Sequence, residues 1–189
     1  MKRTKIKQVL MALSPQEEVL IKGWIRTKRQ SKEFAFLEIN DGSCLSNMQV
    51  FVDNGLPNYA DINSLTTGSA VSLSGALVES PGKGQKWEIQ AKRLKIIHLA
   101  SESYPLQKKR HTDEFLRSIA HLRPRTNKYG AAFRIRSEMS YAIHKFYKEK
   151  GFTQLSTPLI TGSDCEGAGE TFRVTTFKPE TVQNADPKS

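Results

Sequence analysis

Basic and aromatic side chains are interleaved between residues 24 and 40. The basic residues are Arg26, Lys28, Arg29 and Lys32, and the aromatic residues that follow them are Phe34 and Phe36. Cations of this kind neutralise phosphates, and an aromatic ring stacks on an unpaired base with about 1–3 kcal/mol per base. Because Phe34 and Phe36 have the same parity, they share one face of a strand. Two interpretations stay open: a platform for single-stranded nucleic acid, or two core residues beside a solvated basic edge.

Two further features could contribute to nucleic-acid recognition. Gln49 carries an amide donor and an amide acceptor that can read the edge of a base. The alternative is an ordinary exposed glutamine. The Gly82-Lys83-Gly84 sequence either lets the chain wrap closely around a nucleic-acid backbone or forms a simple hairpin turn.

A short segment of carboxylates and glycines at residues 163–170 could hold a small cation. Its sequence is SDCEGAGE. Carboxylates beside glycines give a loop that can close on a cationic group, and Glu166 is the residue expected to pair with an α-ammonium. The alternative is a solvated acidic loop.

The cysteines and histidines do not have the spacing of metal ligands. Cys44 and Cys165 lie far apart, and the four histidines form no His-x-x-x-His or Cys-His pattern. We therefore expect no metal site. Two isolated cysteines in a basic chain are typical of a reduced, cytoplasmic protein.

The charge of the chain favours polyanionic partners. Its 189 residues include 29 Lys and Arg against 19 Asp and Glu, and both halves carry the excess. Nucleic acid is the partner class that fits best, although membrane surfaces and acidic proteins would also be attracted. The basic start of the chain is not followed by the apolar stretch of a signal peptide, and no transmembrane run follows, so we expect no membrane association.

The first half of the chain has the apolar periodicity of five short strands. They are expected at residues 19–25, 34–39, 48–52, 71–78 and 87–97, with a short helix at residues 58–65 between the third and the fourth. Turn sequences at residues 40–43 and 53–55 separate them. This order is that of a five-stranded OB-fold β-barrel, and a different five-stranded barrel remains the alternative.

A second architecture begins after a polar, proline-containing segment. Residues 131–150 carry apolar side chains at helical spacing, and Gly151 is a suitable C-cap for that helix. Residues 152–155 have the character of a strand that ends at Pro158. The last twelve residues, 178–189, show no period.

Four stretches together resemble bacterial-type asparaginyl-tRNA synthetases, a class II family related to the aspartyl and lysyl enzymes. They are GWIR at residues 23–26, ESPGKGQKWEIQ at 79–90, AHLRPRTN at 120–127 and DCEGAGETFRVTT at 164–176. The resemblance runs from about residue 19 to residue 177. The last two stretches are specific, since the aspartyl and lysyl enzymes have other sequences there.

The resemblance implies an α+β chain with four parts. Residues 1–17 form an N-terminal extension, 18–100 an OB-fold anticodon-binding domain, 101–116 a hinge, and 117–189 the incomplete start of a class II catalytic domain. It also implies a homodimeric enzyme that uses ATP and Mg²⁺ to join asparagine to tRNA-Asn.

Site residues follow from the same resemblance. Phe36 is similar to the aromatic residue that stacks on the central anticodon base, with Gln49 reading an edge and Arg29 lining the same site. Glu166 resembles the flipping-loop glutamate that meets the α-ammonium of the amino acid. Pro158 resembles the motif 1 proline at the dimer seam.

The sequence departs from the family in lacking motifs 2 and 3, whose arginines hold the ATP phosphates. Without those cations the charge of adenylate formation has no preorganised partner, so we expect no catalytic residue, no bound cofactor and no ligase activity in these 189 residues. Two alternatives remain: a synthetase-like RNA-binding module without catalysis, and a fragment that only dimerises.

Overall fold

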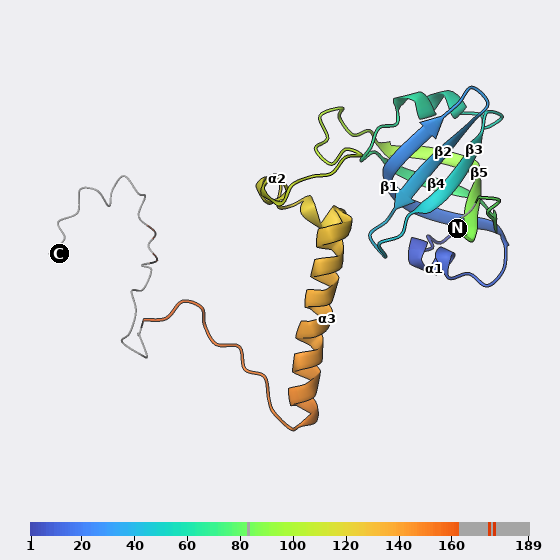
Figure 1. Cartoon of the computed structure of the whole chain (residues 1–189). Coiled ribbons are helices and arrows are strands. Elements are labelled where there is room, and N and C mark those ends of the chain that lie inside the picture. The colour runs from blue at the N-terminus through green and yellow to red at the C-terminus, as the bar shows by residue number, and fades with distance from the viewer. Residues whose placement is uncertain (83, 163–173, 175, 177–189) are drawn as a thin grey trace, which may run out of the picture. The chain divides into compact units, whose positions relative to one another are not determined.

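The computed structural model describes residues 1–82, 84–162, 174 and 176 (Figure 1). Its strands are β1 (Gln16–Gln30), β2 (Phe34–Asn40), β3 (Met48–Asp53), β4 (Ala70–Glu79) and β5 (Trp87–His98). The α-helices are α1 (Ile6–Leu10), α2 (Asp113–Ser118) and α3 (Asn127–Glu149), and the 3₁₀ helices are η1 (Tyr59–Ser64) and η2 (Arg123–Arg125). The chain divides into two compact units, Met1–Met139 and Ser140–Ser189.

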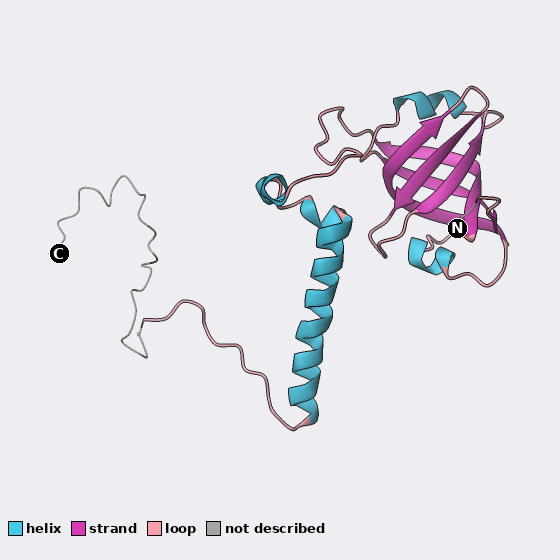
Figure 2. Ribbon diagram, in the orientation of Figure 1, coloured by secondary structure: helices cyan, strands magenta, loops and turns pink. Residues whose placement is uncertain are grey.

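The five strands form a closed barrel in the order β1-β2-β3-β5-β4 (Figure 2). All neighbours are antiparallel except β3 and β5, which are parallel. All five expected strands and the short helix before the fourth are therefore confirmed. β1 extends beyond its expected limits at both ends because it pairs with β4 along its first half and with β2 along its second.

The alternation of side chains along β2 decides which face of the sheet is the core. Ala35, Leu37 and Ile39 are fully buried, whereas Phe34 is 37% exposed and Phe36 is half-buried. The two phenylalanines thus lie on the outer face of the barrel. The interpretation of Phe34 and Phe36 as core residues is wrong, because the aliphatic positions between them fill the interior.

Helix α1, which the periodicity did not predict, packs on the core of the barrel. Ile6 and Val9 are buried in the same cluster as the strand residues. The Asp41 carboxylate, only 1% exposed, accepts hydrogen bonds from the Ile6 N–H and from Arg3. The indole N–H of the buried Trp87 donates to the Ala12 carbonyl 3.1 Å away. The segment expected to be an extension therefore contributes to the barrel core.

The segment after β5 packs against the barrel within the first unit. The Tyr104 ring lies on Gly68, where an added Cβ would meet ring carbons at 2.8 Å. Helix α2 follows, with Thr112 capping its first turn, although no helix was expected there. The first unit continues to Met139, past the expected hinge at residues 101–116. The domain limits themselves stay a prediction.

Helix α3 confirms the long helix that the apolar spacing predicts. It leaves a row of apolar side chains exposed, as do the residues that follow it: Ile135, Met139, Ile143, Phe146, Phe152, Leu155 and Ile160. The strand expected at residues 152–155 is wrong, because these residues are irregular. A strand needs a neighbour to satisfy its backbone groups, and no described segment pairs with this one.

The part of the chain that the structure describes contains no helix suited to crossing a membrane. Within the same residues, no cluster of three or more His, Cys, Asp or Glu side chains could hold a metal ion. Glu166, Cys165 and the rest of residues 163–173 lie outside the described residues.

Asp41 makes the stability of the first unit depend on pH. Burial raises the pKa of its carboxyl, but hydrogen bonds from Ser43, from the Ile6 N–H and from Arg3 outweigh burial, so the pKa is lowered. The stabilisation is complete above the ordinary carboxyl pKa of about 4 and is lost as the pH falls through the lowered value.

We therefore expect Asp41→Asn to reduce the free energy of unfolding at pH 6, with a smaller difference from the parent at pH 3. Urea unfolding followed by Trp87 fluorescence measures both. Asp61→Asn, at an exposed carboxylate on η1, is the control and should change little. An equal loss in the free energy of unfolding at pH 6 and at pH 3 would show that the stabilisation does not come from the charge of Asp41.

Candidate nucleic-acid interface

Three phenylalanines form a cluster on the outer face of the barrel. The ring of Phe36 lies 5.4 Å from that of Phe34 and 5.6 Å from that of Phe51, centre to centre, and both pairs are edge-to-face. The rings of Phe34 and Phe51 are 5.8 Å apart. These are arrangements that aromatic pairs prefer. The result is a partly exposed aromatic surface formed by β2 and β3.

The cluster belongs to a row of residues that the strand register aligns across four strands. Arg29 on β1 is opposite Phe36, Phe36 is opposite Phe51, and Phe51 is opposite Gln90 on β5. Directly opposite residues share a face of the sheet. The Arg29 guanidinium carbon lies 5.9 Å from the centre of the Phe36 ring. A cation and an aromatic surface therefore adjoin, as stacking of a nucleotide requires.

A second row lies beside the first and is polar. It runs from Thr27 through Glu38 and Gln49 to Glu88, again by direct register. The two rows are two residues apart on each strand, so Gln49 and Phe51 lie about 6.6–6.8 Å apart along β3. Gln49 is thus next to the aromatic cluster, which places a hydrogen-bonding amide beside a stacking surface.

The Gln49 side chain is oriented by its neighbour on β5. Its amide nitrogen donates to a Glu88 carboxylate oxygen at 3.1 Å, and the same oxygen accepts from the Ser80 hydroxyl at 3.2 Å. Glu88 is only 4% exposed. Because the carboxylate fixes one N–H of Gln49, the amide oxygen and the second N–H stay available for a ligand.

The basic residues expected to line this face do not all lie on it. Arg29 does, but Lys28 points the other way and donates to the carbonyls of Ile62 and Asn63 at the end of η1. Burial lowers the pKa of the Lys28 ammonium. Arg26 donates to the Arg125 carbonyl instead. A β-bulge between Ile25 and Thr27 shifts the alternation of β1, and a strand period alone could not locate it.

Three residues of the face escaped prediction from the sequence. Phe51 completes the aromatic cluster, and Glu88 holds Gln49 in place. Glu38 lies between Thr27 and Gln49 and accepts from the Asn47 amide. The parity that Phe51 shares with Gln49 was an available signal, but the pairing of β3 with β5 comes from the tertiary structure.

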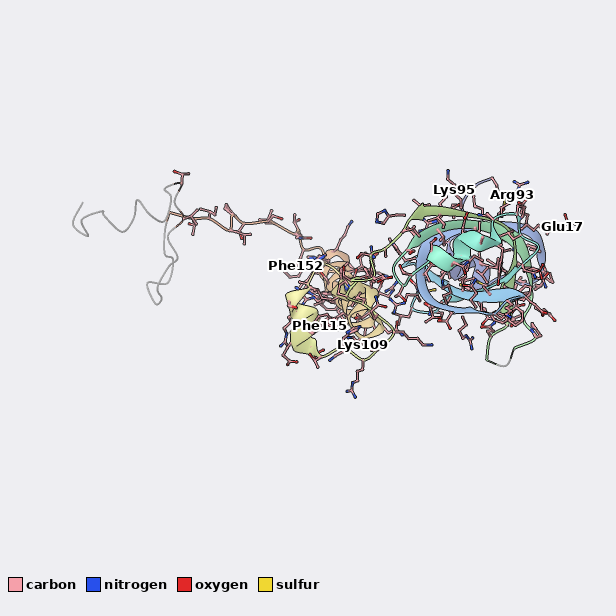
Figure 3. The ribbon with its side chains drawn as sticks, turned by 90° about the horizontal axis from the view of Figure 1, so that it is seen from above. Glu17, Arg93, Lys95, Lys109, Phe115 and Phe152 are labelled. Atoms are coloured by element: carbon pink, nitrogen blue, oxygen red, sulfur yellow. The ribbon has the colours of Figure 1, made fainter. Side chains whose placement is uncertain are left out.

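Two further exposed cations, Arg93 and Lys95, project outward from β5 (Figure 3), beyond the part of that strand that pairs with β3. The two rows contain no nucleophile paired with a base. The chemistry of this face is therefore recognition: stacking, hydrogen bonding to a base edge and neutralisation of phosphate.

Two family models match the chain. Residues 19–97 match the OB-fold nucleic acid binding domain, and residues 112–183 match the class II tRNA synthetases of the D, K and N group. The asparagine–tRNA ligase of Nitratidesulfovibrio vulgaris is 62% identical over 95% of this chain, and that of Geotalea uraniireducens is 56% identical over 93%. Over 95% of its length this chain is a homologue of the asparagine–tRNA ligases.

The chain spans 39% of the length of the Nitratidesulfovibrio ligase and 38% of the length of the Geotalea ligase. Among solved structures, the asparaginyl-tRNA synthetase of Pyrococcus horikoshii complexed with asparaginyl-adenylate superposes with a TM-score of 0.80 at 21% identity. That match covers 94% of this chain and 41% of the Pyrococcus chain. It supports the fold: an OB barrel followed by part of a class II synthetase domain.

The structure brings together three of the five site residues that were predicted for this asparagine–tRNA ligase homologue. Arg29, Phe36 and Gln49 lie on one face of the barrel. Pro158 lies in an exposed, irregular segment of the second unit. Glu166 is outside the described residues. The roles of all five stay predictions.

Phe36 is the centre of the aromatic cluster, so its removal should weaken binding of single-stranded RNA. Phe36→Ala is expected to cost about 1–3 kcal/mol in the binding of a short uridine-rich RNA, because one stacked base loses its platform. Fluorescence anisotropy of a labelled oligonucleotide measures the affinity. Phe115→Ala removes a ring on α2 that is 38% exposed, and it should have no effect (Figure 3). Equal affinities for all three proteins would exclude stacking on Phe36.

Proposed function

We propose that the barrel is the anticodon-binding domain of an asparagine–tRNA ligase and that its RNA partner is tRNA-Asn. The observation that carries this proposal is the aromatic row at Phe36 with the oriented Gln49 amide beside it. An anticodon loop presents unpaired bases, which RNA-binding proteins recognise by stacking and by contacts to base edges. The net charge of +10 favours the same polyanionic partner.

Each residue of the face has a separate task in this proposal. Phe36 stacks on the central anticodon base, and Gln49 forms hydrogen bonds with its edge. Arg29 neutralises a phosphate close to the stacked base. The proposed limits of this domain are residues 18–100, with a hinge at residues 101–116.

The remaining assignments concern the complete ligase. Its substrates are asparagine and ATP with Mg²⁺, and Glu166 is proposed to bind the α-ammonium of asparagine. Pro158 is proposed to lie at a homodimer interface, and the exposed apolar residues of α3 support a packing role for this region. Residues 117–189 are proposed to begin the catalytic domain.

A second candidate function is an RNA-binding module that does not catalyse ligation. It is favoured by one observation: the aromatic face and its polar row lie entirely within the barrel, so RNA binding needs no other part of the chain. The two functions predict the same RNA contacts. They differ in whether Glu166 binds asparagine: the ligase needs this role, and the RNA-binding module does not.

Discrimination at the central anticodon position tests the proposed RNA partner. The parent chain is expected to bind a tRNA-Asn anticodon stem-loop more tightly than the same stem-loop with cytidine in place of the central uridine. Gln49→Ala should reduce this preference, because base-edge contacts supply specificity, while Phe36→Ala should weaken both RNAs alike. Filter binding at fixed salt measures the six affinities of the three proteins for the two RNAs. No preference in the parent chain would contradict anticodon reading by this face.

Glu166 can be tested separately in a ligase that contains this sequence. Glu166→Gln is expected to raise the KM for asparagine strongly, because a charge-assisted hydrogen bond to the ammonium loses its ionic partner. The affinity for tRNA should hardly change. Aminoacylation kinetics with varied asparagine measures the KM, and Glu170→Gln in the same segment is the control. An unchanged KM would return Glu166 to the role of a solvated carboxylate.

A further inference from the structure

A cavity of about 390 Å³ lies inside the first unit, on a different part of the barrel from the aromatic row and the polar row. One wall comes from β1, from the end of β2 and from the loop after β2, and the other from Tyr104, from residues 124–127 and from the first turns of α3. Its volume is within the range of small-molecule sites, which is about 300–1,000 Å³. GWIR and AHLRPRTN, two of the four stretches that carry the family resemblance, meet at this cavity.

Three arginines line this cavity, one from each part of its wall. Arg26 belongs to β1, Arg125 to η2, and Arg134 to α3. Their hydrogen bonds go to neutral oxygens: Arg26 donates to a backbone carbonyl, Arg125 to the Tyr104 hydroxyl, and Arg134 to the carbonyls of Gly130 and Gly42. Since a guanidinium has five N–H donors, most of them stay available.

No carboxylate lines the cavity, so its three positive charges lack a counter-charge among the described residues. Asp41 is adjacent in sequence to two lining residues, but its carboxylate is engaged by Arg3, Ser43 and the Ile6 N–H. Glu38 shares a neighbouring groove with Arg26 but forms no ion pair within 4.0 Å in the described part of the chain. Arg26 and Arg125 are half-buried and Arg134 is exposed. Like charges that line one site repel each other, and a bound anion offsets that repulsion.

The rest of the wall is aromatic and aliphatic. Trp24, Tyr104 and Phe133 supply the rings, and Leu45 and Leu106 supply aliphatic surface. The Arg125 guanidinium lies 4.3 Å from the centre of the Trp24 ring, which holds both side chains at the cavity wall. A ligand with a flat ring and an anionic group matches this combination. A phosphate dianion suits three guanidinium groups better than a single carboxylate does.

We propose that this cavity binds a free nucleoside monophosphate, with its phosphate held by the three arginines and its base among the aromatic side chains. The ligand contacts the barrel and the start of α3 together, so it also fixes these elements to each other. The site does not depend on RNA binding by the Phe36 face.

Titration of the 189-residue chain with uridine monophosphate tests this proposal. The readout is tryptophan fluorescence: Trp24 lines the cavity, whereas Trp87 is 1% exposed in the barrel core and should not respond. We expect a saturable change, with uridine and inorganic phosphate each binding at least tenfold more weakly. A uridine nucleotide is used because the proposed ligase reaction consumes an adenine nucleotide.

Two arginines on the same helix form a matched pair of variants. Arg134→Gln should weaken uridine monophosphate binding about tenfold or more, since a charge-assisted hydrogen bond contributes about 1.5–3 kcal/mol. Arg136→Gln removes an exposed charge two residues away that does not line the cavity, and it should change the affinity less than twofold. Circular dichroism checks that both variants keep their helices.

Three results would overturn the proposal. The first is the absence of a saturable fluorescence change, and the second is an equal loss in Arg134→Gln and Arg136→Gln, which indicates attraction to the overall charge. The third is competition by a single-stranded RNA, which assigns the cavity to an RNA-binding surface. Leu45→Phe gives an independent check that adds no tryptophan: a bulkier side chain at the cavity wall should weaken binding while the RNA affinity of the Phe36 face is kept.

Discussion

Closure of the barrel through β1 is the constraint on which the rest of this structure depends. β1 pairs with β4 in its first half and with β2 in its second, and Trp24 has a register partner on both. The change of partner brings backbones close together at Gly23, where a Cβ would lie 2.6 Å from the Asn40 carbonyl oxygen. Only glycine fits there without displacing a neighbouring strand. The glycine of the GWIR stretch thus has a structural cause.

The interior and the outer face of the closed barrel carry different kinds of side chain. The interior takes the aliphatic positions, and the outer face of β1, β2, β3 and β5 receives the aromatic row and the polar row in register. A bulge beside Arg26 shifts the alternation of β1, so Arg29 faces Phe36 while Lys28 turns to the end of η1. This bulge therefore places Arg29 on the nucleic-acid face, whereas its basic neighbours Arg26 and Lys28 make structural contacts.

The same strand connects the barrel to the sequence that follows it. Arg26 donates to the Arg125 carbonyl, and Arg125 lies over the ring of Trp24, so two residues of β1 that are two positions apart are both engaged by η2. Tyr104 packs on Gly68 and accepts from Arg125. These contacts make residues 1–139 one compact unit, and they create the arginine-lined cavity as a consequence of joining a barrel to a helix.

The sequence by itself determined the five strands, the short helix between the third and the fourth, and the long helix after the barrel, because apolar periodicity is a local property. Its motifs also indicated the synthetase family and the residues Phe36, Gln49 and Arg29. Only the tertiary structure decided that the phenylalanines face outward, that Phe51 and Glu88 complete the site, and that α1 belongs to the core. Each of these depends on which strands are neighbours, and non-local pairing leaves no period in the sequence. The strand expected at residues 152–155 failed for the same reason. Its composition suits a strand, but a strand also needs a neighbouring segment to pair with its backbone groups.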